Sequence, residues 1–198
     1  MPTLIGERVR LELLRPHHAG PLLVAATEDR STYDFTNVPG RPDDMDRYVS
    51  DLLAQHQEGV TIPFVQVERL TKRVIGITRF LTIRIADGAE LPYAVEIGGT
   101  WLAASAQRTG INREAKVLLL GFAFETWHVV RVDLKTDARN ERSREAIAGL
   151  GATFEGVLRS WQPSQADNEA GRFRDSAMFS ILADEWPAIH TTLGHRLR

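Results

Sequence analysis

Apolar residues alternate with polar residues, or form short runs, in seven segments of the chain, as β-strands do. Val9, Leu11 and Leu13 share one side of the first segment, and Ile77 and Ile85 share one side of the third. We expect strands over residues 9–13, 64–69, 74–85, 91–102, 129 to 134–136, 153–161 and 173–182. The turn-like residues 70–73 separate the second and third strands, which favours an antiparallel pair there.

Other segments repeat apolar residues every three or four positions, as amphipathic helices do. The clearest runs from 112 to about 127, with a core face of Ala115, Leu118, Leu119, Phe122 and Ala123. Further helices are expected over 17–28 and 42–59, from the 140–143 segment to Gly151, and from near 184. Antiparallel strands come first and a βαβα segment follows. The pattern therefore predicts a mixed α/β fold: one domain over residues 1–198, with about seven mostly antiparallel strands and helices on both faces of the sheet.

The segment Gln107-Arg108-Thr109-Gly110-Ile111-Asn112 lies between a predicted strand and a predicted helix. Such a turn leaves several main-chain N–H groups unpaired, and the helix dipole adds partial positive charge there. Gly110 allows a ligand to approach the backbone closely. The loop therefore predicts an anion site, most often for phosphate or diphosphate. Taken alone it is read equally well as a purely structural turn.

A second motif lies downstream, where residues 137–143 (DARNERS) join the next strand to a helix that ends at Gly151. The order of strand, phosphate-type loop, helix, strand, Asn-x-x-Ser and helix resembles the GNAT (GCN5-related N-acetyltransferase) superfamily of acyl-CoA-dependent N-acetyltransferases. Residues 97–102 (IGGTWL), 140–143 (NERS) and 180–186 (SILADEW) are similar to its RimJ/RimL-type branch. The resemblance runs from Leu11 to Trp186 and implies the GNAT fold. One departure is Asn112, where the family loop usually has Gly or Ala.

The resemblance implies acetyl-CoA as co-substrate, with its pantetheine arm between two diverging strands, 95–102 and 129–134. The loop and helix start would hold the phosphates, Trp101 and Leu102 would line the gap, and Asn140 would anchor the pantetheine while capping its helix. The cofactor-binding residues expected on this basis are Trp101, Leu102, Gln107, Arg108, Thr109, Gly110, Ile111, Asn112, Arg113, Asn140 and Ser143.

Acetyl transfer to an amine requires donors for the oxyanion, a proton or a hydrogen bond for the departing thiolate, and a neutral amine. Gly98-Gly99 in mid-strand favours a bulge that turns an N–H toward the thioester carbonyl. By resemblance, Ser143 takes the position of the hydroxyl donor to the thiolate. Glu96 is the leading candidate for the general base, directly or through a water, and a buried or salt-bridged structural carboxylate is an equally good interpretation. Glu90 and Glu155 are weaker alternatives.

The composition argues against several other classes of function. The net charge of -2 argues against nucleic-acid binding through a basic face. With no cysteine, the chain has no disulfide and no thiol nucleophile, and the six histidines show no metal-binding spacing, so no metal is expected. We see neither a secretory signal nor an apolar stretch of about 20 residues, which predicts a cytoplasmic protein without a membrane partner. The oligomeric state is left open, a homodimer included.

The acceptor is the least determined feature. A protein or peptide amino terminus is the first hypothesis, because an α-amino group with a pKa of about 8 loses its proton more easily than a lysine side chain. A small amine, such as a polyamine or an aminoglycoside-like compound, is a close alternative, and a non-catalytic acyl-CoA-binding domain is another. The segments expected to face the acceptor have a modest acidic bias suited to a cation: Asp34, Asp43, Asp44, Asp46, Asp167 and Glu169.

Overall fold

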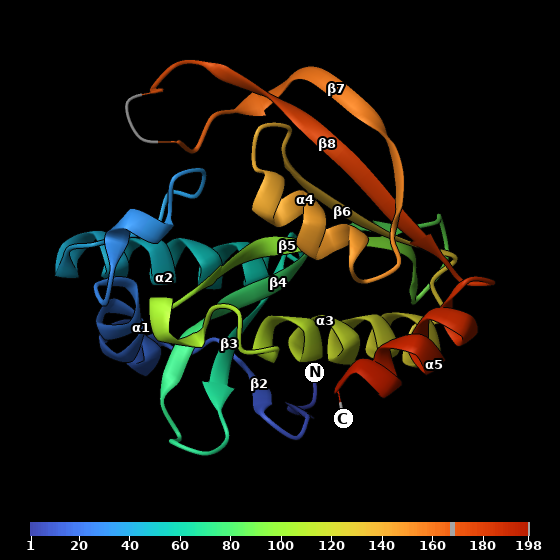
Figure 1. Ribbon diagram of the computed structural model, residues 1–198, viewed down its shortest axis with the longest axis horizontal. Helices are drawn as coiled ribbons and strands as arrows, with labels where there is room; N and C mark the ends of the chain where they lie inside the picture. Colours follow the sequence, from blue (N-terminus) through green and yellow to red (C-terminus); the bar gives the residue numbers. More distant parts are fainter. Residues whose placement is uncertain (167–168, 198) are drawn as a thin grey trace. The chain divides into compact units, whose positions relative to one another are not determined.

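The computed structural model describes residues 1–166 and 169–197, so the predicted acceptor-side Asp167 lies outside the described residues. The strands are β1 (Leu4–Ile5), β2 (Val9–Leu13), β3 (Ile62–Glu68), β4 (Val74–Ile85), β5 (Pro92–Leu102), β6 (Arg131–Asp137), β7 (Thr153–Pro163) and β8 (Phe173–Leu182). The helices are α1 (Ala19–Ala26), α2 (Pro42–Gln57), α3 (Ile111–Gly121), α4 (Glu141–Ala148) and α5 (Trp186–Leu197) (Figure 1).

Hydrogen bonding orders the described strands β1-β2-β3-β4-β5-β6-β8-β7. The pairs β1/β2, β2/β3, β3/β4, β6/β8 and β7/β8 are antiparallel, whereas β5 and β6 are parallel. This is the predicted mixed, mostly antiparallel sheet, with the two-residue β1 as a strand that the sequence pattern missed. Contacts divide the chain into two compact units, which are described separately below, and the single domain expected from the sequence stays a prediction.

Unit 1 contains Met1–Thr32, Val38–Ile83 and Ile97–Leu119. Its core forms where β2, β3 and β4 pair and bury large apolar side chains. Phe64 and Phe80 meet edge to face with their ring centroids 6.1 Å apart, and Leu11 is fully buried. Helices α1 and α2 pack against each other. A bulge between Gln66 and Val67 shifts the β3/β4 register.

Unit 2 contains Tyr33–Asn37, Arg84–Glu96 and Leu120–Arg198. Its strand β6 pairs in parallel with β5 from Ala94↔Arg131 to Glu96↔Asp133, and in antiparallel with β8 from Arg131↔Leu182 to Asp137↔Ser176. Strands β7 and β8 form the long twisted hairpin at the top of Figure 1. Because successive residues of a strand face opposite sides, β6 presents Val132 and Leu134 on one face. The other face carries four charged residues: Arg131, Asp133, Lys135 and Asp137.

Several element boundaries differ from the predicted ones by a few residues, most clearly in α3 and β6. The helix expected from 112 to about 127 begins at Ile111, and its last part, Phe122–Thr126, is a π-helical segment. The bond from Trp127 N to Phe122 O spans five residues, a widening that the apolar spacing does not reveal. Strand β6 begins two residues later than expected and continues to Asp137. Among the described residues, no helix is both long and apolar enough to cross a membrane.

Candidate active site

The predicted phosphate loop forms a compact turn in unit 1 between β5 and α3. The Gln107 side chain donates to Leu102 O at 3.0 Å and to Thr32 Oγ1 at 3.1 Å, so it ties the loop to the end of β5. Thr109 Oγ1 donates to Ala106 O at 2.7 Å. Gly110 has a φ of +85°, in the left-handed region that favours glycine, and exposed Arg108 has a φ of +61°.

The main-chain amides of this loop are mostly unpaired. The amide of Glu114, at the start of α3, bonds Gly110 O at 3.0 Å. In contrast, within the part of the chain that the structure describes, five amides find no acceptor: those of Arg108, Thr109, Gly110, Asn112 and Arg113. They coincide with the positive end of the helix dipole, so the arrangement can bind an anion such as a diphosphate. Arg113 is exposed beside them.

Asn112, the departure from the family loop, has a half-buried side chain in the first turn of α3. Its Oδ1 is buried and has no hydrogen-bond partner in the described chain. Ile111, immediately before it, is a core residue at 3% exposure, and its amide lies 3.5 Å from Thr109 Oγ1. The unpaired Asn112 amide faces the loop, and the Ile111 side chain anchors the helix in the core.

Arg8 is a cation at this loop that the sequence pattern did not identify. Its Nη1 donates to Thr109 O at 3.1 Å, and a Cβ added to Gly110 would lie 2.6 Å from the same nitrogen. Arg8 is held there by Glu114, whose carboxylate accepts the amides of Glu7, Arg8 and Val9 at 2.8, 2.9 and 2.8 Å. Because the partners are more than 100 residues apart in the chain, no local motif reveals them.

The second half of β5 is irregular at Gly99, which has a φ of +55° inside the strand. A Cβ at this position would lie 2.0 Å from Arg79 Nε, so the Arg79 side chain leaves room only for a glycine. Trp101 and Leu102, expected to line a coenzyme gap, are 4% and 7% exposed. The Trp101 indole lies 3.4 Å from the Tyr48 hydroxyl. Their side chains are thus largely part of the core.

In unit 2, Asn140 is the N-cap of α4. Its Oδ1 accepts the amide of Ser143 at 3.0 Å, which fulfils the predicted capping role. The Ser143 hydroxyl is half-buried and makes no hydrogen bond within the described residues. It is therefore available as a donor to a ligand, whereas the local backbone satisfies its amide alone.

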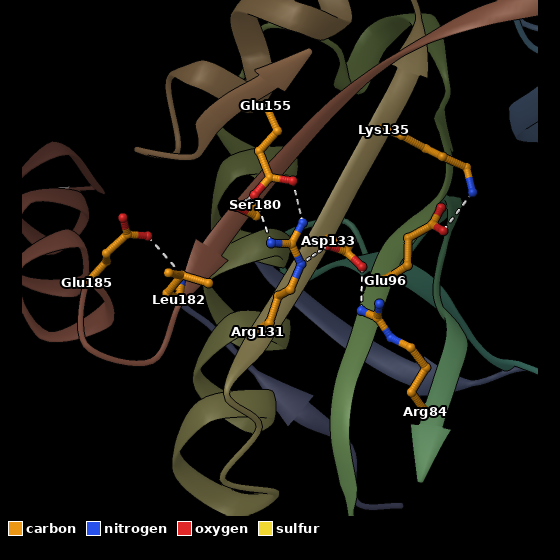
Figure 2. Close-up of polar contacts among 9 residues, drawn as sticks. All are labelled: Arg84, Glu96, Arg131, Asp133, Lys135, Glu155, Ser180, Leu182 and Glu185. Atoms are coloured by element: carbon orange, nitrogen blue, oxygen red, sulfur yellow. Dashed lines mark hydrogen bonds and ion pairs between the residues drawn. The ribbon is translucent and has the colours of Figure 1, made fainter. Parts of the chain in front are cut away.

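Glu96 is 5% exposed and its Oε2 bonds Lys135 Nζ at 2.7 Å (Figure 2). The structure thus places Glu96 in an ion pair, one of the two interpretations that the sequence left open.

The two weaker alternatives for the general base differ in their surroundings. Glu155 accepts two hydrogen bonds from Arg131, at 2.7 and 2.5 Å, and one from Ser180 at 2.7 Å. The Arg131 guanidinium, followed by the Ser180 hydroxyl, lowers the pKa of Glu155 to about 2, which makes this carboxylate a poor proton acceptor. Glu90 is exposed.

The charged face of β6 continues into a wider network in unit 2. Asp133 pairs with both Arg84 and Arg131 (Figure 2). Asp137 accepts three hydrogen bonds from Arg139, whose guanidinium also forks onto Glu169 at 2.7 and 2.9 Å. Although burial favours its neutral form, these bonds keep the pKa of Asp137 below its usual value.

Comparison with known proteins agrees with this geometry. A model of the acetyltransferase (GNAT) domain matches residues 8–153. A GCN5-related N-acetyltransferase from Brucella melitensis superposes with a TM-score of 0.85 at 25% identity, over 100% of this chain and 86% of that one. A protein of T. thermophilus assigned as an acetyltransferase gives 0.82 at 32% identity, over 100% and 98%. A comparison with curated protein sequences finds no match.

More distant structures share the fold alone. RimL, a ribosomal L7/L12 α-N-protein acetyltransferase whose structure contains coenzyme A, has a TM-score of 0.74 at 17% identity, over 92% of this chain and 99% of that one.

A mixed, mostly antiparallel sheet with a glycine-containing turn between β5 and α3 is the arrangement seen in GNAT structures. The chain belongs to the GNAT acetyltransferase family. It is accordingly an acyl-CoA N-acetyltransferase, and acetyl-CoA is its co-substrate.

Proposed function

We propose that the chain transfers the acetyl group of acetyl-CoA to the primary amine of a protein or peptide amino terminus, as the RimJ/RimL-type branch does. The observation that carries the proposal is the row of unpaired main-chain amides between Arg108 and Arg113, which matches what a coenzyme diphosphate requires. Gln107, Thr109, Gly110, Ile111 and Asn112 shape and supply this site, and Arg8 adds a charge-assisted contact.

The remaining cofactor contacts come from three elements. The main chain of Trp101 and Leu102 pairs with the amide-rich pantetheine arm, as an added strand would. Asn140 anchors the same arm through its side-chain NH₂ group, since its Oδ1 is occupied by the helix cap. A main-chain N–H beyond the irregularity at Gly99 stabilises the oxyanion, where one fixed donor contributes about 3 kcal/mol.

In the chemical step the acceptor nitrogen attacks the thioester carbonyl, the N–C bond forms and the C–S bond breaks. The departing thiolate accepts a hydrogen bond from the Ser143 hydroxyl, whose hydrogen atom is not used elsewhere within the described chain, and CoA leaves as the thiolate. The proton lost by the amine passes to Glu96, directly or through a water. No covalent intermediate on the enzyme is required, which suits a chain without cysteine.

The lower proton affinity of an α-amino group favours an amino terminus as the acceptor. An α-amino group has a pKa near 8 and a lysine side chain near 10.4, so an amino terminus needs less help from a base. That difference matters here because Glu96 is already paired with Lys135. The fold shared with RimL supports the same acceptor class at the level of architecture. A small amine is the second candidate acceptor, and the exposed acidic residues Asp43 and Asp46 of α2 favour it.

The test is release of free CoA from acetyl-CoA with a panel of peptides and small amines. We expect turnover on peptides with free amino termini and none on the same peptides when their termini are blocked. Turnover only on polyamines or aminoglycoside-like amines would show that the acceptor is a small amine and not an amino terminus. Tight CoA binding with no turnover on any acceptor would identify a non-catalytic binding domain and reject the proposal.

Two variants test the catalytic roles in the same assay. Ser143→Ala should lower kcat by about 100-fold with little change in CoA affinity, as expected for loss of a hydrogen bond to the charge that develops on the leaving group. Glu96→Gln and Lys135→Gln break the same ion pair. If Glu96 is the base, Glu96→Gln lowers kcat far more than Lys135→Gln. Equal effects of the two would leave Glu96 as a structural partner of Lys135.

A further inference from the structure

Strand β8 places two polar side chains, Arg174 and Ser176, on the same face of unit 2. They are two residues apart, so both point to one side of the sheet. Ser176 pairs with Asp137 of β6, and this face is therefore the charged face of β6. Arg174 is 9% exposed and Ser176 is fully buried. A guanidinium and a hydroxyl thus lie together in a mostly buried position.

Neither group has a partner within the described residues. The Arg174 guanidinium makes no hydrogen bond or ion pair there, and its buried Nε and the Ser176 Oγ are both unsatisfied. Burial lowers the pKa of Arg174, although the charges of Asp137 and Glu96 oppose this effect. A buried cation without hydrogen bonds costs free energy. Such a cost is expected where a ligand supplies the missing contacts.

The neighbouring carboxylates are already used by other cations. Asp137 accepts the hydrogen bonds of Arg139, and Glu96 bonds Lys135, as Figure 2 shows for the latter pair. These two carboxylates act on Arg174 only through their charge. Its fork of N–H donors therefore has no acceptor in the described chain, and a planar anion is the group that it fits best.

We propose that Arg174 and Ser176 bind a carboxylate carried by the acyl acceptor, so that the preferred acceptor is an amine with a nearby carboxylate. The proposal rests on the proposed function and names its substrate class. Arg174 lies within the electrostatic reach of Glu96, the proposed base, which points to the acceptor rather than to the coenzyme phosphates.

Charge balance favours the same ligand. The local cations are Lys135, Arg139 and Arg174, and the local anions are Glu96, Asp137 and Glu169. These three positive and three negative charges sum to zero. A zwitterion, which carries one ammonium and one carboxylate, leaves that sum unchanged when it binds. Two sources share this chemistry: a free amino acid, through its α-carboxylate, and a peptide that begins with Asp or Glu, through its side chain.

The experiment measures binding, by calorimetry in the presence of CoA, so that it does not depend on turnover. The probes are two matched pairs: a C-terminally amidated tripeptide starting with Asp against one starting with Asn, and alanine against alaninamide. Wild type should bind the carboxylate member of at least one pair about tenfold more tightly, the scale of one charge-assisted contact. The pair that shows the preference identifies the source.

Arg174→Met should abolish this preference, whereas Arg159→Met, which removes an exposed arginine of β7, should retain it. Arg174→Lys keeps the charge without the fork and should retain only part of the preference. An unchanged preference in Arg174→Met, or no preference in wild type, overturns the proposal. Carboxylate-selective binding by a protein that releases no CoA from acetyl-CoA would reject the proposed function but support the carboxylate subsite.

Thermal unfolding separates the subsite from a structural role. Because Arg174 makes no hydrogen bond within the described residues, Arg174→Met should leave Tm unchanged or raise it by about 2–4 °C. If Arg174 instead balances Asp137 and Glu96 structurally, its loss lowers Tm and leaves the ligand preference intact, and that combination also contradicts the proposal.

Discussion

Gly110 has a backbone conformation that favours glycine, and it lies in the proposed phosphate site. Its φ of +85° is strained for any residue with a Cβ, and that Cβ would meet Arg8 Nη1 at 2.6 Å. We predict that Gly110→Ala lowers the free energy of unfolding by about 1 kcal/mol. We also predict that it weakens CoA binding at least tenfold, because relieving the strain would move the amides that we propose to hold the diphosphate. Denaturant unfolding and calorimetry with CoA measure the two effects.

Gly59→Ala is the matched control for this change. Gly59 also has a positive φ, +74°, and a Cβ there would meet nothing within 4 Å. The control should lose similar stability and keep full CoA affinity. If Gly110→Ala binds CoA as well as Gly59→Ala does, the turn before α3 is not the phosphate site.

At the scale of elements, Asn140 caps α4 and is also the residue proposed to hold pantetheine. Asn140 Oδ1 caps the helix through the Ser143 amide. Asn140→Ala should cost about 1 kcal/mol of stability, whereas Asn140→Asp should cost little, because aspartate caps a helix as well as asparagine does. If the Asn140 amide group also holds pantetheine, both variants should raise the KM for acetyl-CoA. A normal KM in the stable Asn140→Asp variant would limit Asn140 to capping.

The periodicity of the sequence predicted most of the elements, because strand alternation and helical spacing are local properties. Strands β2, β4 and β8 begin and end at the predicted residues, and the other predicted strands are displaced by only a few. The π-helical segment Phe122–Thr126 could not be predicted, since it changes the backbone hydrogen bonds without changing the order of apolar residues. The two-residue β1 is too short to show any alternation.

In the candidate site, too, the residues in local motifs were predictable and those that depend on long-range contacts were not. The Gly110 turn and the Asn140 cap are contiguous motifs and were visible in the sequence. Arg8 reaches the turn only because Glu114 binds a strand more than 100 residues away, and Arg174 is recognisable only by its burial without a partner in the described chain. A sequence shows that such residues are charged but does not show which charges remain unpaired after folding.

At the scale of the whole molecule, the net charge is close to zero, but individual carboxylates still make the stability depend on pH. Hydrogen bonds from Arg131, then from Ser180, lower the pKa of Glu155 to about 2, and those from Arg139, then from Ser164, do the same for Glu169. In the unfolded chain a glutamate titrates near 4.3. Both groups therefore stabilise the folded protein above that pH, and the contribution is lost as the pH falls toward 2.

Glu155→Gln tests this coupling. Because the Glu155 side chain is 38% exposed, solvent screening reduces its contribution to about 1 kcal/mol at pH 7. We expect wild type to be more stable than Glu155→Gln by that amount at pH 7, with the difference shrinking between pH 4.5 and 2 in denaturant unfolding. The sign follows from the unfolded chain, which binds a proton over this range that the folded chain does not. Glu145→Gln, which removes an exposed glutamate of α4, is the matched control and should change stability at pH 7 by less than Glu155→Gln does. A difference between wild type and Glu155→Gln that stays constant down to pH 2 would mean that Arg131 does not hold Glu155 ionised.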